Sequence, residues 1–410
     1  MEWLTKGLSM SRYGFSMAAL CVLGVAASPV SPAGRTGIRS THASLLVDTV
    51  RVSHDALVRA LDNPSACQPP GRAAGEWLRG QSVVQAGEFA FVGGEIMMLD
   101  ARESRVHAYS RDGRDLGTYG FKGAGPGEFQ GRVHLVSWPG DTVAVHAVNQ
   151  AHLVLYRGHR YQRTVILPKS LASGNAIANG SLTGNNAVVF AAYDAFDVLP
   201  RQTESVRSTF SLVLWQPGNP EATPMRRNIP ASELTIWPER GGSGSGRILG
   251  NFGRKTFIGV LRDQVAVLDN AARSVELIEM NGRVRRVVTL DIPDVPVTAA
   301  DRDSAAQENR TSLARFPADR EGLEHFPRTR SSISQLSADN ADGFWITVTP
   351  PIAKGTPLHI RFTSAGKPDR CIRIAGNARI AAYSTDRVVT VTAQDDGDVV
   401  NLVQTAAFPR

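Results

Sequence analysis

The residues best suited to binding an anion in this 410-residue chain gather in one segment, residues 298–334. The candidate contacts are Arg310, Arg320, His325, Arg328 and Arg330. Guanidinium groups bind carboxylates and phosphates through paired N–H donors, and a protonated imidazole adds another donor. The segment would then act as a lid or docking surface over a ligand. A solvated helix with ordinary surface charges is the alternative that such a run of charges also predicts.

A glycine-rich loop, GFKGAGPGEF at 120–129, is a second motif that could hold phosphate. Its defining residues are Gly123, Gly125, Pro126, Gly127 and Glu128. A Walker loop needs GxxxxGK[ST], but here Pro-Gly follows the glycine, and a dinucleotide GxGxxG is absent as well. The glycines permit backbone angles closed to other residues, proline fixes one φ angle, and the glutamate can accept backbone N–H bonds. We therefore interpret the loop as structural.

Three cysteines are too few for a disulfide scaffold and too scattered for a zinc ribbon. Cys21 lies in an apolar N-terminal run. Cys67 and Cys371 could form a disulfide if the protein is exported to an oxidising compartment. Two separate buried thiols are the alternative.

Motifs for nucleophilic or metal-dependent catalysis are absent. The chain contains no GxSxG, no HExxH and no CxxC, and its nine histidines are dispersed. His146 stands where the other two copies of a sequence repeat carry aspartate, Asp100 and Asp269. We interpret it as a β-sheet residue, although a histidine on an inner strand can also line a channel. No metal-ligand set is evident, so the metal content stays unknown.

The elements that must position these residues are repeats of a strand–turn–strand phrase. MMLDARESRVHAYSRDGR at 97–114 returns as VAVHAVNQAHLVLYRGHR at 143–160 and as VAVLDNAARSVELIEMNGR at 265–283. Apolar residues alternate within each copy, and Asp-Gly or Asn-Gly marks the turn. With weaker copies, the anchor positions of the repeat fall near 100, 146, 193, 269, 348 and 393. Units of about 40–50 residues with four strands predict a propeller, here an all-β fold of six blades.

One helix is expected inside this β architecture. Thr298 can cap it, Asp301 and Asp303 suit its positive end, and Pro317 ends it. It forms an insertion at 298–334, between blades four and five. A second insertion contains RGGSGSGR at 240–247, which is typical of a mobile linker.

The phrase LDARESRVHAYSRDGRDLGTYG, the loop GFKGAGPGEF and the C-terminal DNADGFWITV resemble the bacterial six-bladed β-propeller family related to NHL-repeat proteins. The resemblance covers about 77–408. It implies that 298–334 is the helical excursion found at this place in the family. Lactonases, amidating-type lyases and sialidases share this kind of ring. The Glu, Asn, Asn and Asp that hold a cation in gluconolactonase-type enzymes cannot be mapped here, and the sialidase Asp box is absent.

The N-terminus has the layout of a signal peptide. An apolar run at 16–27 follows Lys6 and Arg12, and small residues precede a cleavage point after Ala27. We therefore expect three parts: a signal peptide at 1–27, an N-terminal segment at 28–80 and the propeller at 81–410. LLVDTVRV at 45–52 alternates as a strand does and could complete the last blade, closing the ring. No later run is long enough to cross a bilayer.

These observations predict an exported, monomeric β-propeller that acts as a scaffold for an unknown small-molecule or protein ligand, with no cofactor evident. The alternative is a propeller enzyme, a metal-dependent lactonase or lyase with its site at the central channel, and only that alternative would require Ca²⁺. Nucleic acid is not an expected partner. The formal charge is +7, but only six of the 45 basic residues are lysine and no basic run of five occurs.

Overall fold

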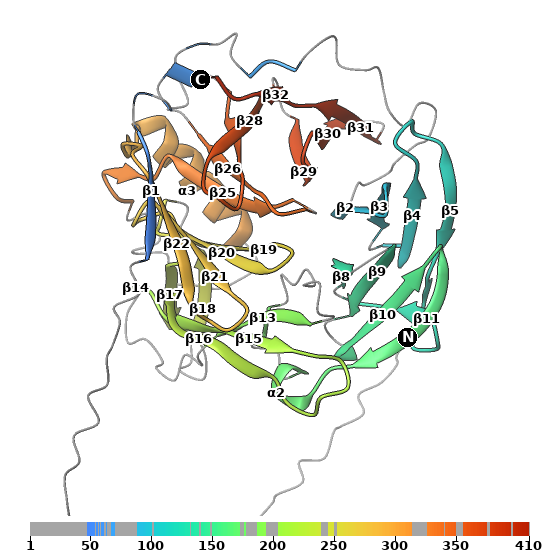
Figure 1. The fold of residues 1–410 in the computed structure, drawn as a ribbon. Coiled ribbons are helices and arrows are strands. Elements are labelled where there is room, and N and C mark those ends of the chain that lie inside the picture. The colour runs from blue at the N-terminus through green and yellow to red at the C-terminus, as the bar shows by residue number, and fades with distance from the viewer. Residues whose placement is uncertain are drawn as a thin grey trace, which may run out of the picture. The chain divides into compact units, whose positions relative to one another are not determined.

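The computed structural model describes residues 47–409, without 70–87, 178–186, 194–203, 239–244, 314–325, 350–355 and shorter gaps of one to three residues. The unit Leu46–Arg410 is a six-bladed β-propeller with one long helix, as the repeats predict (Figure 1). The expected signal peptide and most of the segment 28–80 lie outside the described residues.

Each blade is an antiparallel sheet whose strands follow one another from the centre of the ring to its rim (Figure 1). The first blade contains β2 (Glu88–Val92), β3 (Glu95–Asp100), β4 (Arg105–Tyr109) and β5 (Asp115–Tyr119). The second contains β8 (Val133–Trp138), β9 (Thr142–Ala147), β10 (His152–Arg157) and β11 (Arg160–Ile166). The third contains β12 (Ala176–Ile177), β13 (Val188–Tyr193), β15 (Thr209–Trp215) and β16 (Thr223–Pro230).

The remaining blades continue this order. The fourth contains β19 (Thr256–Val260), β20 (Gln264–Asp269), β21 (Ser274–Glu279) and β22 (Val284–Leu290). The fifth contains β25 (Ile333–Ala338), β26 (Phe344–Val348), β27 (Leu358–Phe362) and β28 (Pro368–Arg373). The sixth contains three strands, β29 (Arg379–Tyr383), β30 (Arg387–Gln394) and β31 (Gly397–Gln404). Short elements between blades are β6 (Phe121–Lys122), β7 (Glu128–Phe129) and α2 (Lys169–Ala172).

The repeated aspartates shape the turn after the second strand. Asp100 Oδ1 accepts hydrogen bonds from the backbone N–H groups of Arg102 and Glu103, at 2.9 and 3.0 Å. Asp269 Oδ1 does the same for Ala271 and Ala272, at 2.9 and 3.4 Å. These side-chain-to-backbone bonds stabilise the tight turn, which explains why aspartate recurs at this position of the repeat.

Apolar side chains between neighbouring blades form the core. The contact between the last blade and the first closes the ring, because Phe91 and Met98 of the first blade share a buried cluster with Val391 and Leu402 of the sixth. Burial of this apolar surface stabilises the closed ring without a strand shared between the two blades.

The expectation that the strand near 45–52 completes the last blade is wrong. Strand β1 (Asp48–Val52) pairs in parallel with β22, on the outer edge of the fourth blade. Arg286 donates two hydrogen bonds to Asp48 there, and Val52 joins the apolar core between the fourth and fifth blades. The free edge of β22 therefore offers β1 both an opposite charge and an apolar contact.

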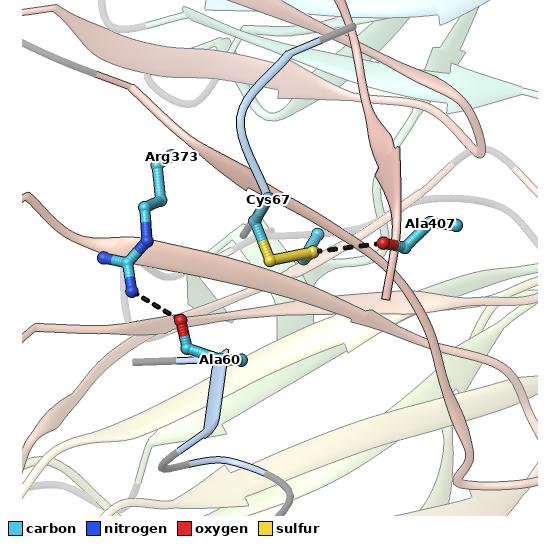
Figure 2. The surroundings of a disulfide bond; sticks show 5 residues. Ala60, Cys67, Arg373 and Ala407 are labelled. Atoms are coloured by element: carbon cyan, nitrogen blue, oxygen red, sulfur yellow. Dashed lines mark hydrogen bonds between the residues drawn. A yellow bond between two sulfur atoms is a disulfide. The ribbon is translucent and has the colours of Figure 1, made fainter. Parts of the chain in front are cut away.

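A disulfide between Cys67 and Cys371 joins the N-terminal segment to β28, the outer strand of the fifth blade (Figure 2). Arg373 adds two hydrogen bonds to this contact. Its guanidinium donates to Ala60 O at 2.7 Å, and its backbone N–H donates to Cys67 O at 2.9 Å. The C-terminal strand β32 (Ala406–Ala407) pairs with β28 as well. Strand β28 thus holds both Cys67 of the N-terminal segment and the C-terminal strand.

Two insertions interrupt the repeat. The first forms a separate sheet of β14 (Glu204–Val206), β17 (Leu234–Pro238) and β18 (Ser245–Leu249). Its strand β18 includes residues 245–247, so this part of the expected linker is ordered by pairing with β17. The second carries α3 (Ala299–Leu313) between blades four and five, as predicted, and its ends are joined by β23 (Val295–Pro296) and β24 (Thr329–Arg330).

No helix among the described residues is both long and apolar enough to span a membrane.

Candidate functional site

The antiparallel order of the blades places both insertions on one face of the ring. In such a blade the first strand begins, the second ends, the third begins and the fourth ends at the same edge. The connections between blades therefore leave from that edge, together with the turn between the second and third strands. We call the face that carries the described residues 120–131, 204–208, 231–238, 245–249, 252–255, 291–313 and 326–332 the insertion face.

A glutamate–histidine pair lies at this edge on the innermost strands of two neighbouring blades, β2 and β8 (Figure 1). Glu88 Oε1 is 2.6 Å from His134 Nδ1, and Glu88 Oε2 accepts the N–H of Leu135 at 2.7 Å. Because β8 is the innermost strand of its blade, an N–H that bonds Glu88 rather than β9 points towards the centre of the ring. The carboxylate thus holds the imidazole in place, and both side chains are partly exposed.

Two further histidines surround His134. His146 is its cross-strand partner on β9, and His152 begins β10. Burial lowers the pKa of His146 to about 4, and the nearby His134 and His152 act in the same direction. Within the described part of the chain, His146 Nδ1 and His152 Nε2 are buried without a hydrogen-bond partner. His146 also packs edge-on against Phe190 of the third blade, so it belongs mainly to the core.

The structure describes only part of the anion-contact set expected from the sequence. Arg310 lies within α3, whereas Arg320 and His325 lie outside the described residues. Arg328 is exposed, and its carbonyl oxygen accepts the N–H of Val297 at 2.9 Å. Arg330 is half-buried in β24, and its Nε is buried without a hydrogen-bond partner among the described residues.

The two insertions contact each other and are anchored to the ring. The rings of Phe252 and Phe326 meet edge to face with their centres 5.6 Å apart. Arg207 of the first insertion pairs with Asp269, at 2.9 Å, and so ties that insertion to the end of β20. The segment that carries Arg328 and Arg330 is therefore held against the other insertion by Phe326, and Arg207 holds that insertion to the ring.

The glycine-rich loop has a structural geometry. The carboxylate of Glu128 fills the loop: its Oε2 accepts the N–H of Gly125 at 2.8 Å, and a Cβ added at Gly123 would collide with it. Gly127 has a φ of +75°, and its carbonyl oxygen accepts the hydroxyl of Tyr156 at 2.7 Å. The side chain of the loop itself thus occupies the place where a phosphate would have to bind.

Sequence reasoning missed the Glu88–His134 pair and a second buried histidine. His359 Nδ1 lies 2.9 Å from Thr347 Oγ1 and 3.1 Å from the hydroxyl of Tyr383, between the fifth and sixth blades. Burial lowers the pKa of His359 to about 4. The available signal was positional: Glu88 and His134 both stand at the start of an inner strand, where side chains reach the insertion face.

No protein-family model and no curated protein matches the chain. Among solved structures, the chain is similar to a Bacteroides fragilis protein named as exported, with 10% identity and a TM-score of 0.43. The alignment covers 88% of this chain and 99% of that protein. It is also similar to virginiamycin B lyase from Staphylococcus aureus, with 9% identity, a TM-score of 0.36 and coverage of 80% of this chain and 97% of the lyase. A gluconolactonase from Xanthomonas campestris is similar too, with 9% identity, a TM-score of 0.39 and coverage of 83% of this chain and 95% of the gluconolactonase. Identities this low concern the fold and say nothing of the activity.

Proposed function

We propose that this protein is an exported binding scaffold that holds an anionic ligand on the insertion face. The observation that carries the proposal is the state of Arg330, whose Nε is buried without a partner among the described residues. A buried donor left unsatisfied is costly, and a bound carboxylate or phosphate would supply the missing acceptor.

The surroundings of Arg330 support this proposal. Arg328 lies two residues before Arg330 in the same segment and is exposed, so a second guanidinium is available to a ligand. Asp301, at the start of α3, has a pKa lowered mainly by a hydrogen bond from the backbone of Thr298, and Arg330 contributes a smaller electrostatic effect. Arg310, Arg320 and His325 are further proposed contacts of the same ligand.

The signal peptide, the export and the relation to NHL-repeat proteins form part of the same proposal. The apolar run at 16–27 and its flanking basic residues support export. The Cys67–Cys371 disulfide supports it too, because disulfides persist in oxidising compartments. The recurring strand–turn–strand phrase supports the NHL-type relation.

Thermal unfolding in the presence of inorganic phosphate or citrate, at constant ionic strength, tests the binding proposal. A ligand that binds only the folded state raises the Tm with its concentration. We expect this rise for wild type, a clear loss in Arg330→Ala and a partial recovery in Arg330→Lys. Arg157→Ala is the matched control, since Arg157 is exposed at the end of β10, on the opposite face. The proposal is wrong if neither anion raises the Tm, or if Arg330→Ala and Arg157→Ala behave alike.

One observation favours the second candidate, a lactonase or lyase with its site at the centre of the ring. A carboxylate that holds an imidazole in one orientation, as Glu88 holds His134 at 2.6 Å, is an arrangement that suits a general base. Metal analysis, with hydrolysis of simple lactones by wild type and His134→Ala, separates the two candidates. Turnover that His134→Ala abolishes, together with stoichiometric Ca²⁺, would favour the enzyme.

A further inference from the structure

Three metal-ligating side chains converge on the first blade, at the turn between its second and third strands. Asp100 ends β3, Glu103 lies in the following turn and His107 is in the middle of β4. Each can offer one ligand atom such that all three atoms lie within 4.8 Å of one another. In a tetrahedral site with metal–ligand distances of about 2.1 Å, ligand atoms are about 3.4 Å apart, so small rotations of the exposed Glu103 side chain would complete the set.

The ligand atoms are held by contacts that leave lone pairs available. The two turn hydrogen bonds of Asp100 use Oδ1, which leaves Oδ2 for a cation. His107 Nδ1 lies 3.1 Å from Thr118 Oγ1 on β5. When Nδ1–H donates to this hydroxyl, Nε2 carries the lone pair, and a hydrogen bond from the second ring nitrogen is the usual support of a metal-bound histidine.

The fourth blade provides an internal comparison, because its turn is the same and its side chains differ. Asp269 makes the same pair of turn bonds as Asp100. Ala272 stands in place of Glu103, Glu276 in place of His107, and Val287 is the cross-strand partner of Glu276 as Thr118 is of His107. The turn therefore requires only the aspartate, because the fourth blade forms it without a glutamate, histidine or threonine at the matching positions.

The carboxylates of the fourth blade are paired with arginines more closely than Glu103 of the first blade is. Asp269 is paired with Arg207 at 2.9 Å and Glu276 with Arg226 at 3.0 Å. In the first blade, Arg105 lies 3.6 Å from Glu103, and both side chains are about half exposed. Such a surface pair contributes little stability, so a cation can compete with it for the glutamate.

We propose that Asp100, Glu103 and His107 bind a divalent transition metal of the zinc class. An imidazole nitrogen with two carboxylates suits Zn²⁺ and its neighbours, whereas Ca²⁺ takes six to eight oxygen ligands. Water completes the coordination, since the protein supplies three ligands. The site stands independently of the anion-binding proposal, because none of its ligands belongs to the insertions.

Calorimetric titration of untagged protein with ZnCl₂, and separately with CaCl₂, tests this site. We expect one Zn²⁺ per chain and a rise in Kd of at least about 10-fold in His107→Ala and in Glu103→Gln. Thr118→Val should weaken binding by a smaller factor through the orientation of His107. The turn bonds do not depend on Glu103, so the Glu103→Gln variant keeps its fold and separates metal binding from stability.

His159→Ala is the matched control for this titration. His159 also pairs with a glutamate, Glu95, at 2.7 Å, but it belongs to no set of three ligands among the described residues. Its removal should leave the Zn²⁺ affinity unchanged. Failure of wild type to bind Zn²⁺, equal affinity in His107→Ala and wild type, or tighter binding of Ca²⁺ than of Zn²⁺ would each overturn the proposal.

Discussion

Burial changes the chemistry of two histidines, His146 and His359, whose pKa values both fall to about 4. For each, desolvation of the charged form is the first cause. Between about pH 6.5 and pH 4, each of these histidines is protonated in the unfolded chain and neutral in the folded chain. The unfolded state then holds more protons, so the free energy of unfolding rises with pH and is lost as the pH falls through this window.

Replacing His146 by leucine tests this dependence. We expect wild type to lose stability on acidification from pH 7 to pH 4.5 and His146→Leu to lose less, by a difference on the order of 2 kcal/mol, since each unit of pKa shift corresponds to about 1.4 kcal/mol. Urea unfolding at both pH values measures the change. His159→Ala is the control, because His159 is partly exposed. Equal losses in His146→Leu and wild type would contradict the assignment.

Single residues differ in how far their roles could be predicted. The recurrence of aspartate was visible in the repeat, and its turn bonds in the structure join it to residues only two and three positions away. Glu88 and His134 were not, because they are 46 residues apart and meet only after two blades pack together. Glu128 was assigned to the loop from its neighbours, and its bond to Gly125 is likewise local.

At the scale of elements, α3 illustrates a helix predicted from its ends. The sequence indicated Thr298 as the cap and Asp301 in the first turn. In the structure Asp301 Oδ2 accepts hydrogen bonds from both the N–H and the hydroxyl of Thr298, and the N–H of Asp301 bonds Thr298 Oγ1 at 3.1 Å. This reciprocal cap satisfies donors that the first turn would otherwise leave unpaired.

Thr298→Ala should therefore loosen the start of α3. We expect a local loss of about 1 kcal/mol, because the variant removes both hydroxyl bonds of the cap. Hydrogen exchange measured by mass spectrometry should become faster in peptides from 299–306 while the blades keep their protection. Ser304→Ala is the control, since Ser304 is exposed within the same helix. Unchanged exchange in Thr298→Ala would show that packing alone holds the helix.

Strands were easier to find than their partners. Alternating apolar residues predicted β1 as a strand, but its pairing with β22 depends on residues 238 positions away, such as Asp48 and Arg286. Strand β18 was hidden by its glycines and serines, which favour a linker by composition. Its pairing with β17 overrides that preference. Local pattern therefore indicates strands, whereas the choice of edge is a tertiary property.

For the molecule as a whole, the period of the repeat predicted six blades, and the manner of closure was not predictable. The first and last blades meet through buried side chains such as Phe91 and Leu402. The N-terminal segment instead bridges the fourth and fifth blades, with β1 on the edge of one and Cys67 bonded to the outer strand of the other. The sequence left open whether Cys67 and Cys371 pair, because spacing alone does not place their Cα atoms 5.1 Å apart.

The disulfide should stabilise this arrangement because it closes a loop across 304 residues of the chain. A long cross-link restricts the unfolded ensemble, and natural disulfides contribute typically about 2–4 kcal/mol. We expect Cys67→Ser with Cys371→Ser to lower the urea midpoint without changing the ring, since Arg373 still bonds the backbone of Ala60 and Cys67. Thiol titration of native protein that is produced from residue 28 onwards should find neither Cys67 nor Cys371 reactive until reductant is added.

The position of the disulfide predicts where its loss acts first. Because β1 and Cys67 are peripheral to the blades, limited proteolysis of the double serine variant should release the segment around residues 47–67 before any blade is cut. Arg373→Ala in the oxidised protein is the control: it removes the side-chain bond to Ala60 but leaves the covalent tie, so this segment should stay attached. Simultaneous cleavage of segment and blades in the serine variant would mean that the cross-link supports the closed ring itself, and the closure by blade packing alone would then have to be revised.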